Sequence, residues 1–241
     1  MAKLHDQWTV LPHGPLREID YGLLTVVGQI PMPLGNFPRR MTAIGLTGKR
    51  TALFSPIPLA DAAMERIEAL GEPAFLIIPS GAHRLDSRPY KARYPRARVV
   101  APPGAREKVS EAVAVDLMAD RLDDPDVKLQ TVAGTGDREF ALTVRRPGGT
   151  SLIVNDVIAH VANPKGPGAW LMSRLFGFGA RRPAIPRPIR SMLVTDPAAL
   201  GGQLEQWAAI EGLRRIIPSH GEVIDQRPAA ELSRLAQMLR N

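Results

Sequence analysis

The stretch Arg214-Arg215-Ile216-Ile217-Pro218-Ser219-His220-Gly221-Glu222-Val223-Ile224 decides how the fold is interpreted. Its pair of isoleucines predicts a short buried strand, and the proline that follows marks the point where strand pairing stops. His220 is therefore expected at the end of a strand, where the sheets of α/β proteins usually carry their sites. Gly221 has no Cβ, so the backbone can turn tightly there and a ligand or metal can approach the imidazole. A surface histidine in an ordinary turn is the alternative interpretation.

Two further strand-like runs end in the same way. Ala74-Phe75-Leu76-Ile77-Ile78-Pro79 leads to His83, and Ser151-Leu152-Ile153-Val154 leads to Asn155-Asp156. Both runs are apolar and short, as is typical of buried strands. Polar side chains that follow separate buried strands can converge on one point of a sheet edge. We therefore predict that His83, Asp156 and His220 gather at a common site.

The composition limits the chemistry that the chain can carry out. Its 241 residues include no cysteine and 5 histidines. Disulfides, thiolate metal sites and a cysteine nucleophile are therefore excluded, and any bound metal must use histidine and carboxylate ligands. The length fits one domain over residues 1–241 with a substantial core.

The net charge of +7 favours anionic partners, and we expect a small anionic molecule. Aromatic residues make up only 5% of the chain, and no basic–aromatic stripe occurs, so no nucleic-acid partner is expected. The first ten residues hold Asp6 and no apolar core, which is unlike a signal peptide. No apolar run approaches the ~20 residues of a membrane helix, so we expect a cytoplasmic protein.

The pattern of apolar residues predicts two β-rich halves, each followed by helices. We expect a hairpin turn at residues 47–50, a proline-rich loop at 31–38, and helices at 61–70, 105–113, 196–211 and 229–239. Strands are expected at residues 21–30, 41–46, 51–55, 74–78, 98–101, 127–132, 139–144, 151–154, 191–195 and 214–217. Two β-rich halves of this kind predict two sheets packed face to face with helices outside them.

Residues 163–188 are predicted to be irregular because they are dense in proline, glycine and arginine. Within them, Trp170–Phe178 is strongly apolar and has arginines close by. Three interpretations remain open for this stretch. It is a helix packed on the core, a cover over the site, or a contact with a membrane surface of the basic amphipathic kind.

Three motifs carry a resemblance to a known family. Ile216 to Gly221 looks like a final ligand turn, Asn155-Asp156 takes the place of a Gly-Asp pair, and Tyr94 to Val99 looks like the turn and strand after a first ligand motif. From about Thr42 to Ile224 the chain resembles the metallo-β-lactamase superfamily. The resemblance implies an α+β fold, the four-layer αββα sandwich, with a metal site at strand ends. It also implies hydrolysis of ester, amide, thioester or phosphodiester bonds.

The ligand set implied by the resemblance is depleted. The stretch from Ser80 to Asp86 offers one histidine and one aspartate, and Gly149 stands where the resemblance places a ligand histidine. The surviving residues imply a single-metal site, zinc or another divalent ion, in which Asp156 and His220 are also catalytic. The implied metal ligands are His83, Asp156, His220 and, if the segment after Asp156 is helical, His160.

Basic residues near these ligands are candidates for substrate contacts, with a solvated loop as the alternative. The candidates are Arg84, Arg88, Arg181 and Arg182. Two functions therefore stay open. The first is a metallo-β-lactamase-fold hydrolase acting on a small anionic substrate through one metal. The second is a non-catalytic binding module that keeps the fold but has lost the metal site.

Overall fold

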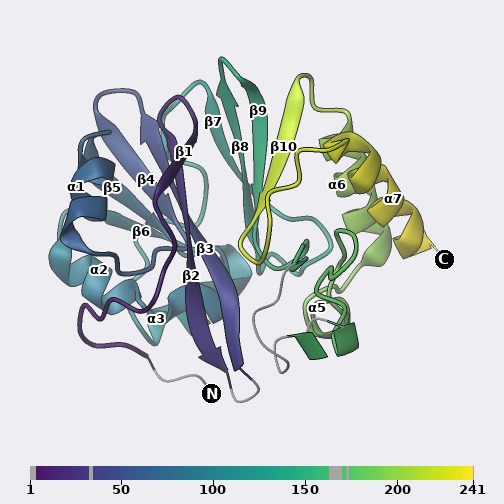
Figure 1. Cartoon of the computed structure of the whole chain (residues 1–241), viewed down its shortest axis with the longest axis horizontal. Coiled ribbons are helices and arrows are strands. Elements are labelled where there is room, and N and C mark those ends of the chain that lie inside the picture. Colours follow the sequence, from purple (N-terminus) through teal and green to yellow (C-terminus); the bar gives the residue numbers. More distant parts are fainter. Residues whose placement is uncertain (1–3, 33–34, 163–169, 172–173, 241) are drawn as a thin grey trace.

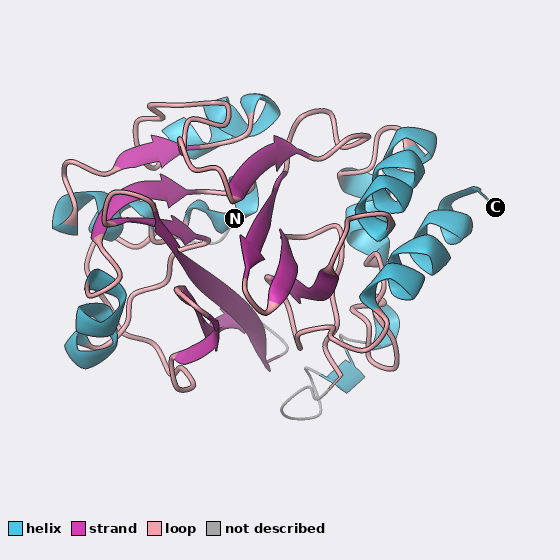
Figure 2. Cartoon of the chain, turned by 90° about the horizontal axis from the view of Figure 1, so that it is seen from above, coloured by secondary structure: helices cyan, strands magenta, loops and turns pink. Residues whose placement is uncertain are grey.

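The computed structural model describes residues 4–32, 35–162, 170–171 and 174–240. Two β-sheets lie face to face in the middle of the molecule, and helices cover the outer face of each (Figure 1). Seen from above, the strands occupy the centre and the helices lie on either side (Figure 2). The expected α+β fold, a four-layer αββα sandwich, is therefore confirmed.

The first sheet has six strands, and they lie side by side in sequence order. Neighbours from β1 to β4 are antiparallel, whereas β4, β5 and β6 are parallel. The expected hairpin turn after β3 is present. The strands are β1 (Arg17–Asp20), β2 (Leu23–Met32), β3 (Gly35–Leu46), β4 (Arg50–Phe54), β5 (Glu72–Ile77) and β6 (Arg98–Val100).

The second sheet has four strands in the order β10-β9-β8-β7. Its strands are β7 (Val127–Thr131), β8 (Phe140–Arg146), β9 (Gly149–Val154) and β10 (Leu213–Pro218). The pair β9 and β10 is parallel, with Val154 opposite Pro218. Because parallel strands end at the same edge of a sheet, the residues that follow β9 and β10 lie close together.

The helices divide between the two outer faces (Figure 1). On the first sheet lie α1 (Asp61–Glu68), α2 (Ser87–Arg93) and α3 (Arg106–Ser110), with the 3₁₀ turns η1 (Gly81–Arg84) and η2 (Pro103–Ala105) beside them. On the second sheet lie α6 (Pro197–Ala208) and α7 (Pro228–Arg240). The short α5 (Arg187–Met192) precedes α6. No helix among the described residues is long and apolar enough to cross a bilayer.

Three apolar clusters separate the four layers. Successive strand residues point to opposite faces, so Leu24 packs under the helices of the first sheet while Leu23 packs between the sheets. The cluster between the sheets also holds Phe140 and Ile217 from the second sheet. Trp207 of α6 belongs to the third cluster, on the outer face of the second sheet, and is 2% exposed. Truncating such a side chain to alanine costs about 3–5 kcal/mol of stability.

The start of α6 was predictable from two residues. The Asp196 carboxylate accepts a hydrogen bond of 2.9 Å from the backbone N–H of Ala199, and Pro197 occupies the first helical position. Both features are preferred at helix starts because the first backbone N–H groups have no partner within the helix.

Two predicted segments are wrong. The strand expected at residues 191–195 is absent: α5 runs to Met192, and the N–H of Thr195 donates to Gly134 instead of to a strand. In the loop expected at residues 31–38, the described residues 31–32 and 35–38 are strand, with Gln29 opposite Pro38 in the β2–β3 hairpin, and residues 33–34 lie outside the described residues. β4 pairs only with residues 42–46 of β3, so the half of β3 that contains Pro38 has a strand partner on one side only. A proline, which lacks the backbone N–H, is tolerated at such an edge. Part of the irregular segment, residues 163–169 and 172–173, lies outside the described residues.

Candidate metal centre

Three side chains from three strand ends meet between the two sheets. His83 lies in η1 after β5, Asp156 follows β9, and His220 follows β10. One ligand atom from each lies within 4.8 Å of the others. The Asp156 Oδ1 atom is 3.4 Å from His83 Nε2 and 3.1 Å from His220 Nε2. The predicted convergence of these three residues is therefore present.

The spacing of these atoms suits a divalent ion. Zinc binds imidazole nitrogen and carboxylate oxygen at 2.0–2.2 Å, and the ligand atoms of a tetrahedral site are then about 3.3 Å apart. Oδ1 of Asp156 stands 3.4 Å and 3.1 Å from the two imidazole nitrogens, close to that edge length. Two histidines and one carboxylate also form a donor set of the kind that catalytic zinc sites use.

The orientation of His220 is fixed by its other ring nitrogen. Nδ1 lies 2.7 Å from the backbone oxygen of Pro38. A carbonyl oxygen can only accept, so Nδ1 carries a hydrogen and donates it. In the neutral tautomer that donates from Nδ1, the Nε2 atom carries a lone pair, and this atom lies 3.1 Å from the Asp156 carboxylate. Two electron-rich atoms are stable at that distance only with a cation between them, either a proton or a metal ion.

His83 is held in a similar way. Its Nδ1 lies 2.7 Å from the hydroxyl oxygen of Ser55, which directly follows β4. Burial lowers the pKa of His83, and this outweighs the opposing effect of the Asp156 charge. The imidazole is therefore neutral near pH 7, which is the state that binds a metal. The ring centroids of His83 and His220 are 5.2 Å apart.

Asp156 supplies the negative charge of the group. Burial on its own would raise the pKa of Asp156, but the imidazoles of His83 and His220 outweigh it and hold the pKa below its usual value. The other carboxylate oxygen accepts a hydrogen bond of 3.2 Å from Ser80, and Ser80 in turn accepts one of 3.2 Å from the Asn155 amide. Asp156 is therefore an oriented, ionised carboxylate.

A buried arginine fastens the His220 turn to the first sheet. The Arg40 guanidinium donates to the Pro218 oxygen at 3.1 Å and to the Gly221 oxygen at 2.6 Å, on either side of His220. It also donates to the Thr25 hydroxyl at 3.1 Å. Burial lowers the pKa of Arg40 to about 10, so the side chain stays charged at neutral pH. Arg40 was not predicted from the sequence, although an Arg39-Arg40 pair inside a mostly apolar strand is a visible signal.

Asp86, which the first motif offered as a possible ligand, is committed elsewhere. One of its oxygens pairs with the neighbouring buried Arg39, and the other lies 2.6 Å from His5 Nδ1. Its side chain is 1% exposed and is not part of the group formed by His83, Asp156 and His220. Asp86, which directly precedes α2, instead joins His5 in the chain before β1 to Arg39 of β3.

His160 lies outside the group, contrary to the expectation of a fourth ligand. Residues 155–162 do not form a helix, which was the condition for that role. The backbone of His160 instead bridges to Gly221, with its N–H donating to the His220 oxygen at 3.0 Å. Its ring lines a cavity of about 530 Å³, and Nδ1 is buried without a hydrogen-bond partner among the described residues. Burial lowers the pKa of His160.

The four arginines proposed to contact substrate divide into two pairs. Arg84 pairs with Glu111 at 3.1 Å, and Arg88 pairs with Asp6 at 2.6 Å and donates to the backbone at the end of α3. Their donors therefore hold η1 and α2 in place. Arg181 and Arg182 line the cavity beside His160, where Arg182 also pairs with a glutamate of α7 at 2.8 Å.

Gly149 is not placed where a metal ligand would be. It begins β9, and Asp156 lies beyond the other end of that strand. Five residue steps of extended strand separate the two ends by about 17 Å. Gly149 has φ +108°, and an added Cβ would lie 2.9 Å from the Gly212 oxygen, so the glycine serves a tight turn. In this sheet, the segment that connects β7 to β8 at the same end as the candidate metal centre is residues 132–139.

Glu139, at the end of that segment, is a buried carboxyl group that was not predicted from the sequence. It is 0% exposed and accepts a hydrogen bond of 3.0 Å from the N–H of Val157, next to Asp156. Burial, with the nearby Asp156 charge, raises the pKa of Glu139 well above its usual value. Burial therefore favours the protonated form of this carboxyl group, and in that form it adds no charge behind the cluster.

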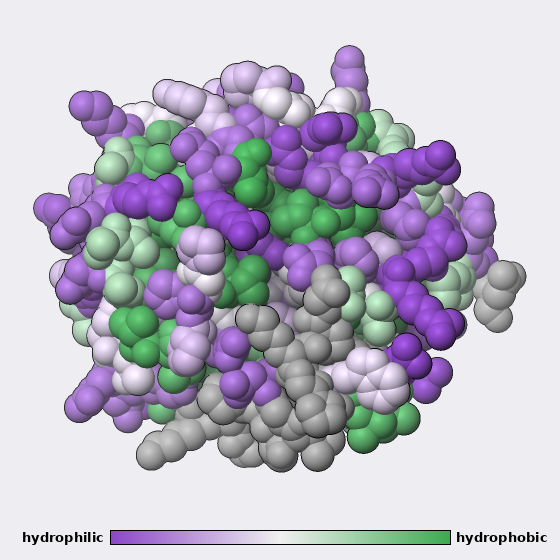
Figure 3. All heavy atoms as spheres, in the orientation of Figure 1, coloured by the Kyte–Doolittle hydropathy of each residue, from purple (hydrophilic) through white to green (hydrophobic). Residues whose placement is uncertain are grey.

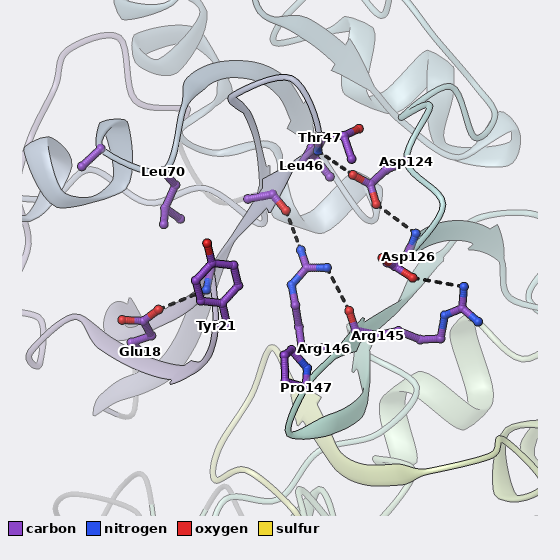
Figure 4. Close-up of a pocket in the computed structure, with 13 residues that line it drawn as sticks. Glu18, Tyr21, Leu46, Thr47, Leu70, Asp124, Asp126, Arg145, Arg146 and Pro147 are labelled. Atoms are coloured by element: carbon purple, nitrogen blue, oxygen red, sulfur yellow. Dashed lines mark hydrogen bonds and ion pairs between the residues drawn. The ribbon is translucent and has the colours of Figure 1, made fainter.

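Two cavities differ in their relation to the cluster. One of about 350 Å³ borders the His220 turn and is lined by Pro12, His13, Gly14, Val27, Gly28, Gln29, Asn36, Pro38, Val161, Gly221 and Glu222. A larger one, of about 680 Å³, lies at the opposite end of the sandwich (Figure 4). On β3, Leu46 in the larger cavity is eight residues from Pro38, about 26 Å along the strand. Arg145 and Arg146 on its wall already bind Asp126 and the Gly45 oxygen (Figure 4).

The four-layer αββα architecture of this chain is similar to that of solved metallo-β-lactamases. The metallo-β-lactamase FIM-1 from Pseudomonas aeruginosa in its mono-zinc form matches the chain with a TM-score of 0.63 at 12% identity, covering 95% of this chain and 96% of that one. The metallo-β-lactamase from Hirschia baltica matches with a TM-score of 0.61 at 12% identity, covering 93% and 98%. The metallo-β-lactamase from Erythrobacter litoralis matches with a TM-score of 0.61 at 13% identity, covering 92% and 96%.

No protein-family model and no curated protein matches the sequence. The likeness is therefore one of structure at low identity. The chain is a divergent member of the metallo-β-lactamase fold, as its sequence motifs implied.

Proposed function

We propose that the chain is a hydrolase that binds one divalent metal ion, zinc, through His83, Asp156 and His220. The observation that carries the proposal is the His220 ring: its Nδ1 donates to Pro38, so its Nε2 lone pair faces the Asp156 carboxylate at 3.1 Å. A proton or a metal ion must lie between these two atoms, and the combination of imidazole and carboxylate is one that zinc prefers. The mono-zinc form of FIM-1, a structural neighbour, supports a one-ion site.

The residues of the chain have separate roles in this proposal. A bound divalent ion would act as a Lewis acid and lower the pKa of a bound water. His83 and His220 supply imidazole nitrogens, and Asp156 supplies a compensating charge that Ser80 orients. Arg40 keeps the His220 turn in register with β3 by holding the carbonyl groups on either side of it. The 350 Å³ cavity beside this turn is large enough to receive a small substrate.

An anionic substrate is the part of the proposal that rests on charge. The chain carries a net charge of +7, which favours anionic ligands. Arg181 and Arg182 line the cavity beside His160, and the His160 backbone is hydrogen-bonded to His220. Guanidinium groups bind carboxylates and phosphates with paired hydrogen bonds. We therefore propose that these arginines bind a carboxylate or phosphate group of the substrate.

Metal content is the direct test. Protein purified without chelator, and apo-protein titrated with zinc, should bind about one ion per chain by elemental analysis and calorimetry. His220→Ala should abolish binding because it removes a ligand. His13→Ala is the matched control, since the His13 ring contacts the Gly14 oxygen beside it and lies outside the group of three. Zinc at a hundred times its Kd should raise Tm by about 5–10 °C.

Absence of bound metal, together with an unchanged Tm on adding chelator, would refute the metalloenzyme proposal. The alternative, a binding module without catalysis, is favoured by the small ligand set of three among the described residues. Hydrolysis of a panel of small phosphate and carboxylate esters separates the two. Activity that requires added zinc and that His220→Ala abolishes would eliminate the binding module.

A further inference from the structure

The net positive charge of the chain is concentrated in one segment, residues 157–195. Between Asp156 and Asp196 there is no aspartate or glutamate, while six lysines and arginines occur. The described arginines of this segment are Arg174, Arg181, Arg182, Arg187 and Arg190, and all five are exposed. Arg182 forms an ion pair with Glu231. The other four have no ion pair with any residue that the structure describes, so their charge faces solvent.

The same segment exposes large apolar side chains. Of nine such side chains exposed among the described residues, five lie here: Trp170, Leu171, Leu175, Phe176 and Met192. Their exposed fractions run from 39% for Phe176 to 74% for Met192. The Arg174 guanidinium lies 4.4 Å from the centre of the Trp170 ring, so cationic and apolar groups are interleaved. Figure 3 shows strongly apolar and strongly hydrophilic atoms side by side at the lower right of the molecule.

We call these side chains the basic–apolar surface, defined by Trp170, Leu171, Arg174, Leu175, Phe176, Arg187, Arg190 and Met192. Exposed apolar groups of this size mark an interaction site when they gather in one place. The surface is attached to the metal centre by backbone hydrogen bonds, from Val161 to Phe178 and between Ala159 and Ala184. Phe178 packs on Phe37 at 4.6 Å, and Phe37 packs on the His220 ring at 5.2 Å.

From this arrangement we infer that the chain docks on an anionic membrane surface through the basic–apolar surface. Interfacial segments combine cationic side chains, which attract anionic headgroups, with tryptophan, phenylalanine and leucine, which enter the boundary of the acyl layer. The arginines provide the complementary charge, and the apolar side chains are 39–74% exposed. A nucleic acid is less suited, because three of the five exposed apolar side chains, those of Leu171, Leu175 and Met192, offer no ring on which bases stack. The inference does not require a bound metal or any catalytic activity.

Vesicle binding by the full chain tests the inference. Co-sedimentation should show binding to phosphatidylcholine vesicles that contain phosphatidylserine, and little binding to phosphatidylcholine alone. Binding should weaken as salt is added because the headgroup attraction is screened. Tryptophan emission should shift to the blue on binding as Trp170 leaves water. The variant Trp170→Phe should bind and lose that shift, since Trp207 is buried and Trp8 packs against the core away from this surface.

Matched variants separate this surface from general charge. Each arginine near a membrane is worth about a factor of five, so Arg187→Gln with Arg190→Gln should weaken binding about 25-fold. Arg106→Gln with Arg121→Gln removes the same charge from exposed residues outside the surface and should change binding less than about three-fold. Leu175→Ser should weaken binding, whereas Met238→Ser, which changes an equally exposed side chain on α7, should not.

Three results would overturn the inference. The first is equal binding to vesicles with and without phosphatidylserine. The second is an equal loss of binding from both arginine double variants, which would assign binding to net charge alone. The third is release of the chain from vesicles by a short nucleic-acid duplex whose affinity falls in the Arg187/Arg190 variant, which would make nucleic acid the ligand of this surface.

Discussion

Gly221→Ala is the most informative single substitution in the chain. Gly221 has φ +99°, a conformation that alanine rarely adopts. A Cβ built there would lie 2.0 Å from the His160 oxygen, 2.2 Å from its carbonyl carbon and 2.6 Å from the nitrogen of Val161. All three neighbours are backbone atoms, so no side chain can rotate away to make room. The 160–161 segment and the His220 turn must therefore separate.

The size of the effect follows from the bonds that join the two segments. The His160 N–H donates to the His220 oxygen at 3.0 Å, and the Glu222 N–H donates to the His160 oxygen at 2.7 Å. Each such bond contributes about 0.5–1.5 kcal/mol, and a left-handed backbone costs alanine about 1–2 kcal/mol. Losing both bonds and adding the strain should lower the free energy of unfolding by about 2–5 kcal/mol. Moving His220 should also weaken zinc binding at least ten-fold, because ligand geometry is strict.

Urea unfolding and zinc calorimetry on the same preparations would measure both effects. Gly202→Ala is the control: Gly202 lies within α6, and a Cβ there meets no atom within 4 Å. Alanine should stabilise that helix by up to about 1 kcal/mol and leave zinc binding unchanged. If Gly221→Ala unfolded within 1 kcal/mol of the parent and bound zinc equally well, the close approach of His160 and Gly221 would not hold in solution.

Three further substitutions test the frame around the site. Asp20→Asn breaks the ion pair with Arg215, whose 2.8 Å contact joins the two sheets with side chains only 7% and 12% exposed, and should cost about 2–4 kcal/mol in urea unfolding at pH 7. Burial would raise the pKa of Asp20, but Arg215 and two backbone N–H donors outweigh it and lower the pKa. The stabilisation by the ion pair is therefore present above about pH 4, and the difference in stability between variant and parent should shrink below that pH. A difference that does not depend on pH would contradict the assignment. Asp126→Asn, in an exposed pair, is the control and should cost less than about 1 kcal/mol. Glu139→Gln should change stability by less than about 1 kcal/mol, because burial raises the pKa of Glu139 and the native group is neutral; a loss above about 3 kcal/mol would show an ionised carboxylate. Arg40→Met leaves two carbonyl groups beside the His220 turn without donors and should cost about 3–5 kcal/mol by thermal unfolding, whereas a loss below about 1 kcal/mol would show that the turn does not depend on it.

The strand ends were predictable from sequence because the signal is local. Each of His83, Asp156 and His220 follows a short apolar run, and such runs form buried strands whatever surrounds them. The pairing of β9 with β10 then brings two of the three together. The helix start at Asp196-Pro197 was visible for the same reason, since capping depends on neighbouring residues.

The frame of the site was not predictable, because its contacts join residues far apart in the chain. Arg40 and Gly221 are 181 positions apart, and no local pattern marks them as partners. Glu139 takes its protonation state from burial between segments that only the folded chain brings together. His160 was assigned to the wrong role for a related reason: its backbone is held by Gly221 and its segment never becomes a helix.

The long β2–β3 hairpin sets a rule for how this chain can change over evolution. Pro38 and Arg40 are two steps apart on β3, and both act on the His220 turn. Because strand neighbours alternate in direction, inserting or deleting one residue between them would turn one of these contacts away from the turn. Additions at the distal tip, beyond Ile30 and Phe37, would leave this spacing intact. Homologues of different length should therefore vary at the tip and keep a proline-carbonyl and arginine spacing of two.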